Sequence, residues 1–125
     1  MKRPKSKKPV KSVKTPKNLE QCFEALNILL FPEDVQEIKN GTEKDMCKYH
    51  FFLGMWIRNN WGLWKKNSKL YDYFKGMGLW HADDMSSVIL DSYYRNLNNL
   101  PLGLDKQIEA YKKYWKEYPH TEEKF

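Results

Sequence analysis

The sequence predicts an all-α fold, a compact bundle of about six helices behind a disordered basic tail. Three observations support this prediction. After the first 18 residues, apolar side chains recur at helical spacing, and no alternating strand pattern appears. Capping residues and helix breakers divide this part of the chain into six segments. With 125 residues, 41% of them hydrophobic and 15% aromatic, the chain has room for one domain with its own core.

A proline separates the first two predicted helices. Apolar residues at helical spacing predict a helix from about residue 19 to residue 30, capped either by Thr15, with a proline after it, or by Asn18. Pro32 ends this helix and begins a short second one, because proline lacks the N–H of a helix interior but fits the first turn. Asn40 and the glycine after it end the second helix.

The longest helical pattern extends from about residue 43 to residue 59. Thr42 followed by Asp45 resembles a capping box at its start. Its second half is apolar on nearly all sides, which predicts a buried central helix. Gly54 lowers helix stability by about 1 kcal/mol relative to alanine, so we expect another helix to cross there at close range.

Three more helices complete the prediction. Ser68 caps a short helix that a Gly-Met-Gly sequence ends. A fifth helix begins near residues 81–83, and Asp91 and Arg95 form an acid-before-base pair on its exposed side. The last helix covers about residues 104–118 and is amphipathic. Its apolar face holds Ile108, Tyr111, Tyr114 and Trp115.

The positive charge is concentrated at the N-terminus. Residues 1–17 hold eight of the 22 Lys and Arg residues and none of the 16 Asp and Glu residues, so the remainder carries a formal charge of about −2. We expect this segment to be a disordered tail, followed by a helical domain at 18–118 and a C-terminal tail at 119–125. Two interpretations of the basic tail stay open, a solubilising extension and an electrostatic contact with nucleic acid or anionic lipid.

Several classes of protein are disfavoured by what the sequence lacks. No apolar stretch approaches the roughly 18 residues of a membrane span, and no secretory signal is present, so a cytoplasmic protein is expected. Cys22 and Cys47 do not form a C-x-x-C pair, which predicts reduced thiols. The chain also lacks a Gly-rich phosphate loop, an H-E-x-x-H sequence and an EF-hand loop, and no cofactor is predicted.

The candidate binding site lies at the end of the third helix and the start of the fifth. Tryptophans, an arginine and amides are concentrated there, which is typical of recognition surfaces for an anion, a base or a side chain of a partner. The alternative is structural, with the tryptophans in the core and the amides on helix-end carbonyls. The candidate partner-binding or ligand-binding residues are Trp56, Arg58, Asn59, Asn60, Trp61, Trp64, His81, Asp83, Asp84 and Arg95.

Catalytic and metal-binding interpretations are weaker. A histidine beside carboxylates and a hydroxyl could perform acid–base chemistry, but the same residues at a helix start are explained by capping and the helix dipole. This group consists of His81, Asp83, Asp84 and Ser86. Four scattered residues could supply zinc ligands, but they lack the usual paired spacing, so no metal site is assigned. These residues are Cys22, Cys47, His50 and His81.

Two sequence blocks, at 50–64 and 81–90, resemble a bacterial domain family of unknown function. Members of that family read H-F-G-L-G-M-W-[IL]-R-N-N-W-G-L-W and then H-P-D-D-M-S, followed by S-Y-H-R. The resemblance covers about residues 18–115 and leaves out the basic tail.

This chain departs from the family pattern at three positions. Phe52 replaces the first glycine, Ala82 replaces the proline, and Tyr94 replaces the histidine of S-Y-H-R. The missing histidine argues against a metal or acid–base role at that position. The resemblance implies a helical fold and a bacterial or phage origin, and it implies no established activity.

The leading hypothesis is a non-enzymatic protein that binds another protein, and an immunity or anti-defence factor is one form of it. A second hypothesis is a small-ligand domain in which Arg58, Asn59, Asn60 and Trp61 hold an anionic or nucleotide-like molecule. A third is nonspecific nucleic-acid binding by the basic tail. An enzyme that uses the polar residues at 81–84 for acid–base chemistry ranks last.

Overall fold

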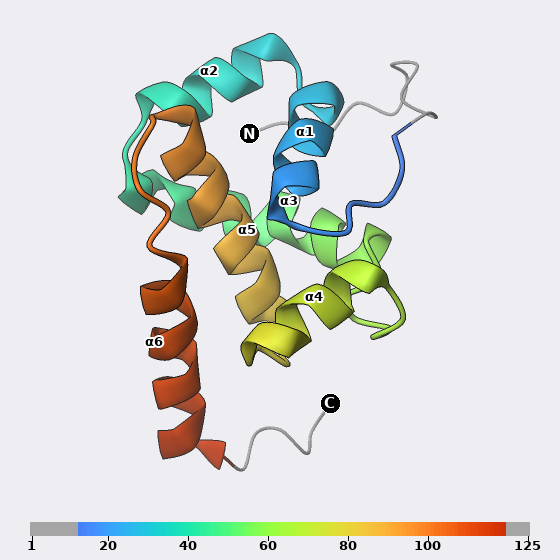
Figure 1. Cartoon of the computed structure of the whole chain (residues 1–125). Coiled ribbons are helices and arrows are strands. Elements are labelled where there is room, and N and C mark those ends of the chain that lie inside the picture. The colour runs from blue at the N-terminus through green and yellow to red at the C-terminus, as the bar shows by residue number, and fades with distance from the viewer. Residues whose placement is uncertain (1–12, 120–125) are drawn as a thin grey trace.

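The structure is a computed structural model that describes residues 13–119. Within that range it contains six α-helices, one short 3-10 helix and no strand, so the all-α prediction is confirmed (Figure 1). The elements are α1 (Leu19–Leu29), α2 (Pro32–Asn40), η1 (Glu43–Asp45), α3 (Met46–Asn60), α4 (Lys69–Met77), α5 (Ala82–Leu97) and α6 (Leu104–Glu117).

Short polar side chains begin three of these helices. Asn18, rather than Thr15, caps α1, and its side-chain oxygen accepts a bond of 2.9 Å from a backbone N–H of the first turn. Thr42 and Asp45 make both bonds of the predicted capping box, at 2.8 and 3.2 Å, although the box opens η1 before α3. Ser68 caps α4 in the same way. Each cap pairs an N–H that the helix itself leaves unsatisfied.

The fifth helix lies in the middle of the fold. In Figure 1, α5 crosses the centre of the bundle, with α3 behind it and α6 along its outer side. Five of its apolar side chains are fully buried, more than in any other helix in the described range. They are Met85, Val88, Ile89, Leu90 and Tyr93. The other helices therefore bury their apolar faces largely against α5 and its neighbours.

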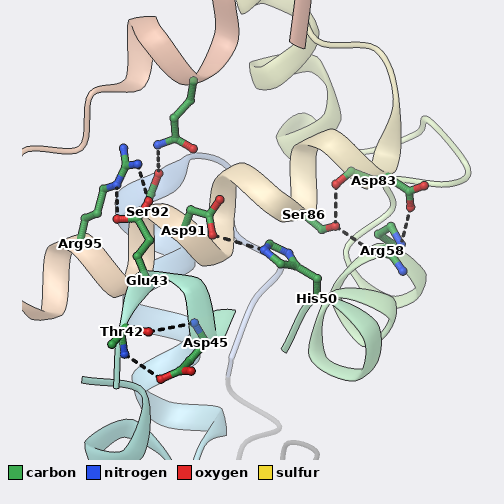
Figure 2. A network of polar contacts seen from close by, with 11 residues as sticks. Thr42, Glu43, Asp45, His50, Arg58, Asp83, Ser86, Asp91, Ser92 and Arg95 are labelled. Atoms are coloured by element: carbon green, nitrogen blue, oxygen red, sulfur yellow. Dashed lines mark hydrogen bonds and ion pairs between the residues drawn. The ribbon is translucent and has the colours of Figure 1, made fainter. Parts of the chain in front are cut away.

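α3 and α5 run antiparallel and are joined by polar contacts at three levels. Along α5, successive contacts reach α3 and η1 in reverse sequence order (Figure 2). Arg58 of α3 contacts Ser86, His50 contacts Asp91 at 3.3 Å, and Glu43 of η1 contacts Arg95. These contacts keep the two longest helices of the described chain in one register.

Gly54 lies where α3 packs directly against α5. A Cβ added at Gly54 would lie 3.6 Å from the Ser86 hydroxyl and 3.7 Å from a methyl carbon of Leu90, both on α5. It would also lie 3.0 Å from the end of the Arg58 side chain. The predicted helix crossing at Gly54 is therefore confirmed.

The prediction that the second half of α3 is buried on all sides is wrong. Phe51 is 64% exposed, Phe52 is 53% exposed and Met55 is 40% exposed. The inner side of the helix, including Leu53 and Ile57, is fully buried. The described helices cover only one side of α3, so the apolar residues on its other side remain in contact with solvent.

The predicted pair between Asp91 and Arg95 is also replaced by tertiary contacts. Asp91 bonds to His50, and the Arg95 guanidinium bonds to Glu43, with 3.1 Å between Nε and Oε1. Each of the two side chains is thus paired with a residue of a neighbouring element rather than with the other.

The last helix packs more loosely than the sequence predicts. Ile108 is its only buried residue, and Tyr114, assigned to the apolar face, is 49% exposed. Tyr111 and Trp115 are partly buried. α6 therefore covers one side of α5 without enclosing it (Figure 1).

The predicted tails fall largely outside the described residues. Residues 1–12 and 120–125 are not described, and residues 13–17 form no regular element. Within that short segment, Val13 is partly buried against the core and Pro16 is buried. No helix within residues 13–119 combines the length and apolar character that crossing a bilayer requires.

We predict that a large side chain at Gly54 destabilises the protein. Gly54→Leu should lower the free energy of unfolding by about 1–3 kcal/mol, because the added atoms push α3 away from α5. Gly76→Leu is the matched control, since nothing lies within 4 Å of a Cβ added at Gly76 of α4. Urea unfolding followed by circular dichroism measures both variants. Equal stability of the two would contradict the close helix contact.

Candidate functional site

The structure divides the ten predicted site residues among three places. Five surround the start of α5, where they meet the end of α3. These are Arg58, Trp64, His81, Asp83 and Asp84. Four lie on another side of the α3 C-terminus, namely Trp56, Asn59, Asn60 and Trp61. Arg95 lies near the other end of α5 (Figure 2).

Arg58 is engaged inside the fold. Its Nη1 donates to the Ser86 hydroxyl at 2.8 Å, and its Nε lies 3.2 Å from a carboxylate oxygen of Asp83. The Nε atom makes no hydrogen bond, so its contact with Asp83 is an ion pair only. The guanidinium also lies 5.8 Å from the ring centre of Trp64. With 14% of its side chain exposed, Arg58 mainly joins the end of α3 to the start of α5.

His81 caps α5 from within an aromatic cluster. Its Nδ1 accepts a bond of 3.1 Å from the backbone N–H of Asp83, which places the proton of the neutral ring on Nε2. The ring stacks on Trp115, with 5.3 Å between ring centres, and meets Trp80 and Trp64 edge-on. We call these four residues the His81 cluster. Only 6% of His81 is exposed, so the imidazole contributes chiefly to packing.

Asp84 links the His81 cluster to α6. The Trp115 indole N–H donates to a carboxylate oxygen of Asp84 at 2.6 Å, and 9% of Asp84 is exposed. Burial raises the pKa of the Asp84 carboxyl above its usual value, and the hydrogen bond from Trp115 opposes this rise. Ionising this carboxyl within the fold therefore reduces stability.

The polar residues at the start of α5 do not form a nucleophile–base pair. The Ser86 hydroxyl donates to the backbone carbonyl of Asp83 at 3.1 Å and accepts from Arg58. The Nδ1 atom of His81 is occupied by the capping bond. Two hollows of about 390 and 700 Å³ adjoin His81, and aromatic side chains form part of the wall of each.

The second group of predicted residues borders a different pocket. Trp61 is 4% exposed and packs edge-on against Trp56, with ring centres 6.0 Å apart. The Asn60 amide donates to the Trp56 carbonyl at 2.8 Å, as the structural interpretation predicts. Asn59, Asn60 and Trp61 nevertheless line a pocket of about 430 Å³, and Arg58 is not part of its wall.

Sequence reasoning missed several residues of both groups. Trp80 was not identified, although it directly precedes the predicted cap of α5, and Trp115 was assigned only to the core face of the last helix. Lys65 and Lys69 line the pocket beside the asparagines. A signal existed, because the run Lys-Lys-Asn-Ser-Lys at 65–69 directly follows the tryptophan block.

Arg95 has a structural role. Its guanidinium pairs with Glu43 and donates to the carbonyl of Leu102 in the loop before α6. The hydrogen bond from Arg95 lowers the pKa of the Glu43 carboxyl. Arg95 therefore joins η1, α5 and the α6 loop, and it does not meet the other candidate residues.

The four residues weighed as zinc ligands do not come together. Within residues 13–119, no group of three or more His, Cys, Asp or Glu side chains is arranged to hold a metal ion. Cys22 is buried, and burial raises the pKa of its thiol well above its usual value, whereas Cys47 is exposed.

Comparison with known proteins identifies one family. The family model described as "Domain of unknown function (DUF6794)" matches residues 15–97. The match ends with α5, so it leaves out α6, which the resemblance noted above was expected to include. A search of curated proteins and a search of solved structures gave no match.

We predict that Asp84→Asn stabilises the protein at neutral pH. Asparagine keeps an acceptor for the Trp115 N–H and removes a charge that burial disfavours. Because the folded-state pKa of Asp84 is raised, the wild type gains stability as the pH falls through that pKa toward the usual carboxyl range. The advantage of Asp84→Asn should therefore shrink on acidification.

Urea unfolding at a series of pH values measures this difference. Asp72→Asn, which removes an exposed carboxylate of α4, controls for the change in surface charge. A stability difference that is absent at neutral pH, or that widens on acidification, would contradict the assignment.

Proposed function

The chain belongs to this family of domains of unknown function, and we propose from its surface that it is a binding domain that docks on another protein through the outer face of α3. This face consists of Phe51, Phe52 and Met55. The observation that carries the proposal is the exposure of both phenylalanines, 64% and 53%, on a helix whose other side forms the core. Adjacent large apolar side chains in solvent are typical of protein-interaction sites.

The outer face of α3 presents contiguous rings. Phe51 and Phe52 pack edge-on with ring centres 4.7 Å apart, and Met55 lies one turn further along the helix. Rigid aromatic rings beside a flexible thioether suit an interface that adapts to a partner. The helix itself is held by its buried side, so the exposed side chains are presented on a fixed support.

Because this face is apolar, burial of its side chains is the main driving force for binding a partner. Fully burying a phenylalanine contributes about 1.5–3 kcal/mol, and about 1.4 kcal/mol corresponds to a tenfold change in affinity. Burial of the exposed parts of the two rings can therefore change the affinity of a complex about tenfold or more.

We predict that Phe51→Ser combined with Phe52→Ser weakens partner binding about tenfold or more and leaves the fold intact. A photo-crosslinking amino acid at position 51 identifies the partner in extracts of the source cell, and calorimetry with that purified partner gives the affinity. Leu100→Ser is the matched control, because Leu100 is 45% exposed and lies in the loop before α6.

Two results would contradict this proposal. One is an affinity for the crosslinked partner that both serine substitutions leave unchanged. The other is concentration-dependent self-association that the double variant abolishes, because the face would then join copies of this chain.

Neutralisation of the partner, as by an immunity or anti-defence factor, is the finer form of the proposal. It is supported by the small size of the chain and by the absence of a nucleophile–base pair at the start of α5. A partner whose own activity falls when the wild-type chain is added, but not when the double variant is added, would support it.

A further inference from the structure

A pocket of about 430 Å³ lies where the end of α3 approaches the turn before α4. Lysines and asparagines make up more than half of the residues that line it. The polar residues that carry the argument are Lys17, Asn59, Asn60, Lys65, Asn67 and Lys69. We call this hollow the lysine pocket. Its volume falls in the range of about 300–1,000 Å³ that is usual for small-ligand sites.

The positive charge of the lysine pocket is not balanced within the described chain. No Asp or Glu residue lines it. The Lys–carboxylate and Arg–carboxylate pairs within residues 13–119 are formed by other side chains. Lys17, Lys65 and Lys69 therefore face one hollow without an acidic partner. Three like charges around a concave surface favour an anion between them.

The backbone around the pocket is closely packed. Gly62 has φ +75°, and a Cβ there would lie 2.7 Å from Cβ of Ser68 and 2.9 Å from Oδ1 of Asn67. A side chain at Gly62 would therefore push the turn open. Ser68 caps α4, so the positive end of that helix dipole also lies at the pocket wall.

The amides supply donors for a ligand with several oxygens. The side chains of Asn59 and Asn67 make no hydrogen bond to another described residue. Lysine and amide donors arranged around an open hollow match the oxygens and charge of phosphoryl groups. Lys17 is also the last residue of the basic N-terminal segment, so further positive charge precedes the pocket along the sequence.

We propose that the lysine pocket binds a phosphate-bearing anion the size of a nucleotide or a short run of phosphates. Arg58, which the sequence assigned to such a site, is held by Ser86 and Asp83 and takes no part. This site involves none of the residues on the outer face of α3, so it is independent of the proposed protein contact.

Calorimetric titration of the full chain at low ionic strength tests the proposal. Three probes distinguish the sources of the phosphates: inorganic tripolyphosphate, ATP and a short single-stranded oligonucleotide. Lys65→Glu combined with Lys69→Glu should lower the affinity for the binding probe about tenfold or more and reduce its salt dependence. Lys65→Arg with Lys69→Arg should retain binding, because the charge is preserved.

Two control variants separate the pocket from charge in general. Lys75→Glu with Lys113→Glu changes the net charge equally at two exposed positions outside the pocket, and affinity should stay within about threefold. The second control variant changes Lys5, Lys7 and Lys8 to Gln in the full chain, which reduces the charge of the N-terminal segment. Chemical-shift changes at the Asn59 and Asn67 amides on adding tripolyphosphate would place the ligand.

The outcomes are distinct. Loss of binding in the glutamate pair at 65 and 69, with both controls binding normally, supports the pocket. Binding that survives this pair but disappears in the N-terminal variant would overturn the proposal and assign phosphate affinity to the tail. No binding of any of the three probes by the wild type would also overturn it.

Discussion

The close antiparallel contact between α3 and α5 is the constraint on which the rest of the structure depends. It leaves little room at Gly54, because Ser86 and Leu90 of α5 lie where a side chain larger than a methyl group would extend. Polar contacts of Arg58 with Ser86 and of His50 with Asp91 lie on either side of the glycine and also join the two helices.

This constraint explains how the candidate residues are used. Arg58 and His81 look like chemistry-bearing residues in the sequence, yet one joins two helices and the other caps α5 within an aromatic cluster. Their polar atoms are engaged by the geometry of the helix ends. Features directed toward solvent remain available for binding, namely the outer face of α3 and the lysine pocket. Both depend on α3, which α5 holds in place.

The family match divides the helical domain into two parts, α1 to α5 and α6. The family match covers the helices from α1 to α5, including both features of α3. α6 lies outside it and has one buried residue, and hydrogen bonds from Trp115 to Asp84 and from Gln107 to Ser92 join it to α5. The walls of the hollow beside Asp84 come partly from this helix, so that hollow combines matched and unmatched parts of the chain.

The sequence by itself determined the local structure: six helices, the cap at Ser68, the capping box at Thr42 and the need for a close crossing at Gly54. These features depend on interactions within a few residues, which a sequence displays directly. The tertiary structure alone decided which side of α3 is covered, that Arg95 pairs with Glu43, and that lysines before α1 and α4 meet the asparagines of α3. The physical reason is that exposure and long-range pairing depend on which helices become neighbours, and helical spacing does not specify this.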